Sequence, residues 1–167
     1  MDTRTAAYAA ATLTFIFAVM ATKWYAAPWL RVRGRAKALI PLLWIHAPRY
    51  VAFQIFSAKA AGFDVPDDIR NRIAYGDALS AVLAFAAVAA LHYRTPIGVA
   101  LAWLLSAVGI FDLLIAMIGG IQANLFAKAA GVTWLILTFY VPVLWVSHGL
   151  IIWQLVSRRS ESLGRNR

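Results

Sequence analysis

The chain has 167 residues, of which 62% are hydrophobic and only 14% are charged. Soluble domains carry roughly 25% charged residues, so this composition excludes an ordinary cytosolic enzyme, a small secreted domain and a disordered tail. The length allows one domain, and we expect a single transmembrane domain over residues 1–167. The predicted fold class is an all-α, polytopic membrane helical bundle.

Apolar blocks follow one another along the chain. The first contains no Asp, Glu, Lys or Arg, and the second is interrupted at its centre by Arg49. Pro96 marks the start of the fourth block, which ends near the pair Gly119 and Gly120, because proline favours the first turn of a helix and glycine its end. The sequence predicts five transmembrane helices, with spans over about 5–22, 38–61, 73–91, 96–119 and 131–156.

The connection after the first block mixes aromatic and basic residues. Lys23, Trp24 and Tyr25 are typical of an interfacial stop. The segment from Trp24 to Ala36 leaves two interpretations open. It is either an amphipathic segment that lies among the lipid headgroups or a cluster of stop-transfer charge.

Two acidic residues precede the third block. Asp67 and Asp68 follow Pro66, and they suggest either a metal or phosphate site or the start of a helix. Carboxylates are favourable at a helix N-terminus because of the helix dipole. We therefore predict an N-terminal cap, with Asp68 beginning a helix that continues through Ile73 into the third span.

The basic residues predict the orientation of the bundle. The net charge of +9 comes with no nucleic-acid-binding motif, so we interpret it as topogenic charge next to anionic headgroups at the inner face. With the N-terminus outside, ten basic residues lie inside and five lie outside, which favours an external N-terminus and a cytoplasmic C-terminus in a bacterial inner membrane. The inner residues are Lys23, Arg31, Arg33, Arg35, Lys37, Arg94, Arg158, Arg159, Arg165 and Arg167, and the outer ones are Arg4, Lys59, Arg70, Arg72 and Lys128.

Four polar side chains are expected within or close to the apolar layer. Arg49 falls near the midplane of the second span, and Asp112, Asp77 and Gln54 fall in the outer half. Ionisable groups at this depth are costly unless they are paired, so each is a candidate functional residue. Asp112 is the best-placed partner for Arg49 and Asp77 the second. Pro48 removes a helical hydrogen bond and predicts a kink beside Arg49.

Two histidines are expected at matching depth on different helices. His46 precedes Arg49 by one turn, and His148 lies on the fifth span. Such a pair could ligate a b-type haem axially, or it could simply bond to hydroxyls such as those of Ser147 and Ser106. No third clear ligand accompanies the pair, and the chain has no cysteine, so we expect no metal site.

Three classes of function remain open. The first is a polar site built from Arg49, Asp112, Asp77 and Gln54 that binds or translocates a small anion, proton or amphiphile. The second is a haem protein using His46 and His148, and the third is a structural or assembly subunit, with a homo-oligomer or a membrane complex as its partner. Catalytic templates such as His-Glu-x-x-His or Gly-x-Ser-x-Gly are absent from the sequence, so an enzyme is the less favoured interpretation.

Overall fold

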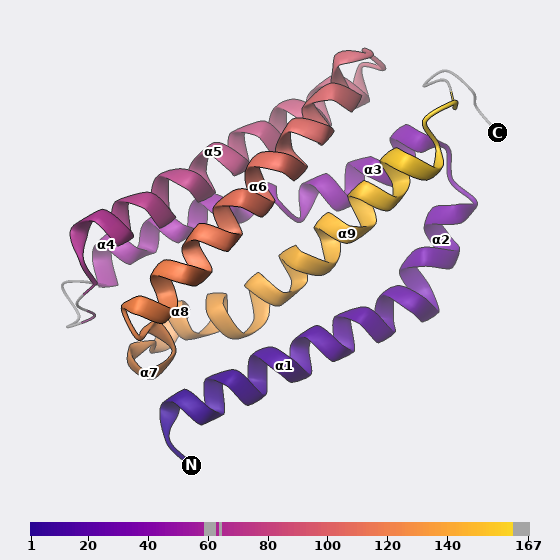
Figure 1. The fold of residues 1–167 in the computed structure, drawn as a ribbon. Helices are drawn as coiled ribbons and strands as arrows, with labels where there is room; N and C mark the ends of the chain where they lie inside the picture. Colours follow the sequence, from indigo (N-terminus) through magenta and orange to yellow (C-terminus); the bar gives the residue numbers. More distant parts are fainter. Residues whose placement is uncertain (59–62, 64, 162–167) are drawn as a thin grey trace.

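The computed structural model describes residues 1–58, 63 and 65–161. Among these residues every regular element is a helix. Lys59, Arg165 and Arg167, which entered the charge count, and the last three residues of the predicted second span lie outside the described residues. Figure 1 shows the long helices lying lengthwise beside one another, with the N-terminus of the chain and the last turn of α9 at opposite ends. We call these the N-terminal and C-terminal ends of the bundle.

Five helical segments are long and apolar enough to cross a membrane: 3–31, 35–58, 67–92, 97–122 and 131–157. The five spans predicted from the sequence are thereby confirmed as candidate membrane spans. Three of them change helical type along their length. The elements are α1 (Thr3–Ala21), η1 (Thr22–Ala26), α2 (Ala27–Arg31), α3 (Arg35–Trp44), η2 (Ala47–Phe53), α4 (Gln54–Ala58), α5 (Asp67–His92), α6 (Ile97–Gln122), α7 (Leu125–Lys128), α8 (Gly131–Leu135), η4 (Ile136–Tyr140) and α9 (Val141–Ser157).

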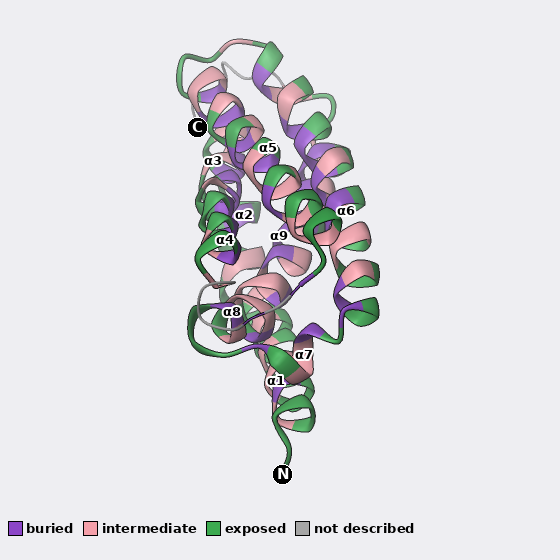
Figure 2. Ribbon diagram, turned by 90° about the vertical axis from the view of Figure 1, so that its left-hand side faces the viewer, coloured by how far each residue is buried: buried purple, intermediate pink, exposed green. Residues whose placement is uncertain are grey.

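The first span is longer than the sequence predicted. It passes Lys23 without ending, because the π-helical turn η1 joins α1 to α2 and the helix continues to Arg31. Most of the segment from Trp24 to Ala36 therefore belongs to this long helix. Only 6% of the residues in its most apolar 18-residue stretch are buried within the protein. In Figure 2 the N-terminal part of α1 is largely green, the colour of exposed residues.

The helix that contains the third span begins one residue before Asp68, the predicted start. Its N-cap residue is Pro66, and Asp67 and Asp68 occupy the first turn of α5. The predicted helix start is therefore correct to one residue, but the acids are not the cap itself. Their negative charges stabilise the start of the helix by interacting favourably with the free N–H groups of the first turn.

The second span breaks beside Arg49, as Pro48 predicts. The α-helix α3 ends at Trp44 and a 3-10 helix, η2, follows from Ala47. Within this break the N–H of Arg49 donates to the carbonyl of His46, three residues back, at 3.2 Å. The fifth span supplies two hydroxyl donors to the carbonyls around the break, from Tyr140 to Ile45 at 2.7 Å and from Ser147 to Leu42 at 3.3 Å.

We expect Tyr140→Phe to lower the free energy of unfolding by about 1 kcal/mol, because it leaves the partly buried carbonyl of Ile45 in the broken helix without its donor. Thermal unfolding in detergent measures this loss. Tyr93→Phe is the matched control, since the Tyr93 side chain is largely exposed. Equal unfolding temperatures for the two variants would show that the hydroxyl of Tyr140 does not support the break.

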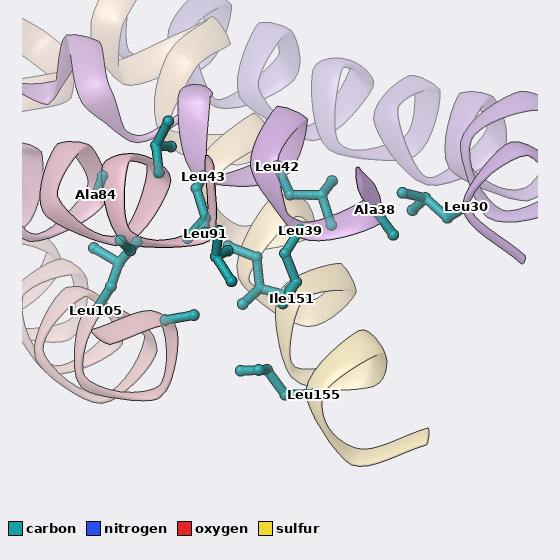
Figure 3. Packing of buried hydrophobic residues seen from close by; sticks show 13 residues of the cluster. Leu30, Ala38, Leu39, Leu42, Leu43, Ala84, Leu91, Leu105, Ile151 and Leu155 are labelled. Atoms are coloured by element: carbon teal, nitrogen blue, oxygen red, sulfur yellow. The ribbon is translucent and has the colours of Figure 1, made fainter. Parts of the chain in front are cut away.

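Apolar side chains fill the C-terminal half of the bundle. Leu39 and Leu43 from α3, Leu91 from α5, Leu105 from α6 and Ile151 from α9 belong to one buried cluster, shown in Figure 3. A smaller cluster around Ile55, Ala74 and Leu125 lies toward the N-terminal end. The predicted polar residues lie between these two clusters along the spans.

Candidate functional site

Arg49 bonds to two aspartates from two other spans. Its Nε donates to Asp77 Oδ1 on α5 at 2.6 Å, and its Nη2 donates to Asp112 Oδ2 on α6 at 2.5 Å. The side chain of Arg49 is 0% exposed, whereas those of Asp77 and Asp112 are 16% and 10% exposed. Both ion pairs predicted from the sequence are therefore present. We call these three residues the ion centre.

Two glycines allow the side chains of the ion centre to approach the helix backbones. A Cβ atom on Gly76 of α5 would overlap Oδ1 of Asp112, so only glycine leaves room for this carboxylate. A Cβ atom on Gly109 of α6 would lie 2.7 Å from His148 Nε2 and 2.9 Å from Arg49 Nη1. Gly109 belongs to a stripe of small residues along one side of α6, which also contains Ser106, Ala116 and Gly120, and such a stripe indicates close helix packing from the sequence alone. Gly76 was missed, although a glycine next to an intramembrane aspartate is a signal that could have found it.

The ion centre has more negative than positive groups. One guanidinium faces two carboxylates, so the net charge is −1 when all three groups are ionised. A charge buried away from water has a high solvation cost. Neutrality therefore requires one additional positive charge on or beside the carboxylates.

The two histidines lie against each other on the buried side of the ion centre. The rings of His46 and His148 have centroids 4.2 Å apart and planes tilted by 49°. His46 Nε2 lies 3.1 Å from Ser147 Oγ, one of the hydroxyls that the sequence offered. A porphyrin has to fit between its two axial imidazoles, and rings in contact leave no space for it. The geometry therefore does not fit the haem hypothesis.

Gln54 does not join the ion centre. Its amide exchanges hydrogen bonds with the hydroxyl of Thr133, at 3.0 and 3.2 Å, and links α4 to α8. Its height along the span agreed with that of the aspartates, but its side chain points toward a different neighbour. In the part of the chain that the structure describes, no three His, Cys, Asp or Glu side chains form a group that could hold a metal ion.

A cavity of about 220 Å³ lies between α5 and α6 at the N-terminal end of the bundle. Asp68, Arg72 and Gln122 supply polar groups to its lining, and Ile73 and Ile115 are among its apolar lining residues. Ile73 precedes Asp77 by one helical turn, and Ile115 follows Asp112 by one turn. The cavity is therefore about one turn from the two partly exposed carboxylates.

Five long apolar helices around a buried ion centre are the features of a multi-pass membrane protein. The chain belongs to the family described as domain of unknown function DUF8737, whose family profile matches residues 6–156. No curated protein and no solved structure shows significant similarity to the chain.

Proposed function

We propose that the protein binds a proton at the ion centre and moves protons across its membrane. The observation behind this proposal is the pairing of one buried Arg49 with two carboxylates, Asp77 and Asp112. A guanidinium stays protonated in proteins, so the mobile proton belongs to the carboxylates. One proton shared by the two aspartates makes the centre neutral.

The charge balance favours a proton over the anion that the sequence also allowed. Nε and Nη2 of Arg49 already donate to carboxylates, and an incoming anion would add to a net negative charge. A proton binds to a single carboxylate oxygen and leaves the second ion pair in place. Buried aspartates and histidines serve as proton relays in membrane pumps and transporters.

The packing supports access from the N-terminal end of the bundle. The cavity between α5 and α6 lies on the side of the aspartates, which are partly exposed, and not on the side of Arg49, which is fully buried. The apolar cluster around Leu43 and Ile151 fills the opposite half. We propose that protons reach the ion centre from the N-terminal end, which the count of basic residues predicts to be the outer side.

Proton flux into liposomes tests this function. Purified protein is reconstituted with a pH-sensitive dye inside the vesicles, and a potassium diffusion potential supplies the driving force. We expect Asp112→Asn to reduce the flux to that of protein-free liposomes, because an amide does not take up and release a proton as a carboxylate does. Asp2→Asn is the matched control, since Asp2 is an exposed acid at the N-cap of α1 and is not among the residues that line the cavity, and asparagine is an equally good N-cap residue. The flux of this variant should equal that of the wild-type protein.

Two outcomes would reject proton transport. One is wild-type flux no greater than that of empty liposomes, and the other is an Asp112→Asn variant that conducts like the wild-type protein. In either case the role of the ion centre would be to stabilise the packing of the second span against α5 and α6. The protein would then belong to the third class, a structural or assembly subunit.

A further inference from the structure

A second group of polar atoms lies beside the ion centre, and these atoms have no hydrogen-bond partner. They include Nη1 of Arg49, both ring nitrogens of His148 and Nδ1 of His46. The hydroxyls of Ser80 and Ser106 are unpartnered as well. His46, Arg49, Ser80, Ser106 and His148 are each no more than 2% exposed.

Several of these atoms come from one level of the bundle. His148 Nε2 and Arg49 Nη1 both lie within 3 Å of the point that a Cβ atom on Gly109 would occupy. Gly76 faces Asp112 and Gly98 faces Leu91, which fixes the antiparallel register of α5 and α6. The same register puts Ser80 opposite Gly109, one turn from Asp77 on the same face of α5.

Unpartnered polar atoms at this depth are costly, and native proteins satisfy nearly all of them, often with ordered water. A buried water makes about three hydrogen bonds to groups that lack other partners. Arg49 Nη1 supplies donors, Ser80 Oγ supplies a donor and an acceptor, and His148 Nε2 supplies a donor or an acceptor according to its tautomer. Together they match the hydrogen-bonding capacity of a water molecule.

We infer that Arg49, Ser80 and His148 bind ordered water beside Gly109, and that His148 exchanges a proton with Asp112 through this water. The second part of the inference rests on the proposed function. Arg49 connects the two sites, because its Nη2 bonds to Asp112 while its Nη1 faces His148.

The proton transfer conserves charge at every stage. The O–H bond of protonated Asp112 breaks, its electron pair stays on the carboxylate, and water relays a proton that forms an N–H bond on His148. Arg49, Asp77, Asp112 and His148 share one mobile proton, so this set of four residues is neutral whether the proton is on the carboxyl or on the imidazole.

Among the described residues, His46 and Tyr140 are two further titratable groups that lie beside this set. His46 contacts the His148 ring, with its Nε2 engaged by Ser147. Tyr140 donates its hydroxyl to the carbonyl of Ile45. Neither group adds a formal charge in its neutral form, so neither disturbs the balance between Asp112 and His148.

Solid-state NMR of protein labelled with ¹⁵N-histidine in liposomes tests the water site. The chain has three histidines, so His→Gln variants assign each ring signal. We expect magnetisation transfer from water to the ring of His148 in the wild-type protein. Gly109→Ala should abolish this transfer because its methyl group would occupy the space, whereas Gly149→Ala should preserve it, since a Cβ there meets nothing within 4 Å. A His148 ring that receives no magnetisation from water in the wild-type protein would overturn the inference, whatever the variants do.

The liposome flux assay tests the proton transfer separately. We expect His148→Gln to lower the flux at least about a hundredfold, the lower end of the usual contribution of a positioned acid–base group. The exposed His92→Gln should leave the flux unchanged. A hydrated His148 with normal flux in His148→Gln would refute the transfer step. Absence of flux in the wild-type protein would reject the proposed function and this step together, while the NMR result would still decide the water site.

Discussion

Replacing Arg49 with alanine is expected to lower the free energy of unfolding by about 3–5 kcal/mol, the usual cost of removing one partner from a buried ion pair. The variant leaves Asp77 and Asp112 facing each other without the guanidinium that separates and neutralises them. It also removes a fully buried side chain that connects three spans. Thermal unfolding in detergent measures the loss, and the exposed Arg159→Ala is the matched control.

A triple variant separates the effect of charge from the effect of lost packing. Asp77→Asn and Asp112→Asn added to Arg49→Ala leave no ionised group at the centre, so part of the stability should return. Such recovery is expected because a buried ion pair is often no more stable than a neutral replacement. If Arg49→Ala unfolds at the same temperature as Arg159→Ala, the two ion pairs do not stabilise the bundle.

The second large effect is expected at Gly76. A methyl group on this residue would overlap Oδ1 of Asp112, so Gly76→Ala must separate α5 from α6 or displace the carboxylate from Arg49. Overpacking of this kind costs about 1–3 kcal/mol, and a displaced Asp112 adds the cost of a broken buried pair. We therefore expect Gly76→Ala to reduce both the unfolding temperature and the proton flux.

Gly149→Ala provides the comparison for Gly76→Ala. Both substitutions place alanine in a long helix, where it is intrinsically favoured over glycine by roughly 0.5–1 kcal/mol. The Cβ at Gly149 would meet no atom within 4 Å, so this variant should be as stable as the wild-type protein or slightly more stable. Equal unfolding temperatures and equal flux for the two alanine variants would show that a methyl group on Gly76 fits between α5 and α6 beside Asp112.

The architecture was predictable because composition and helix length are local properties. The order and approximate bounds of the five spans, and the break beside Pro48, follow from apolar blocks and from the missing N–H of proline. The end of the first span was placed too early. Its continuation depends on a π-helical turn across Lys23 and Trp24, which their interfacial character does not indicate.

The site was only partly predictable because side-chain direction depends on helix rotation. The depths of Arg49, Asp77 and Asp112 indicated their pairing, since few other charges lie at that level. The same depth argument grouped Gln54 with the aspartates, whereas its amide bonds to Thr133. It also matched His46 with His148, but depth does not reveal that the rings are in contact and leave no room for a porphyrin.

The separation of the ion centre along the chain has a consequence for biosynthesis. Asp77 follows Arg49 by 28 residues and Asp112 follows it by 63, so the ribosome makes the arginine before either partner. Its span is also the least apolar of the five, with a mean hydropathy of 1.2 against 2.3 for the span of Asp112. The nascent chain therefore carries Arg49 without a carboxylate partner until Asp77 of the third span emerges, which links stable membrane insertion of the second span to synthesis of the third.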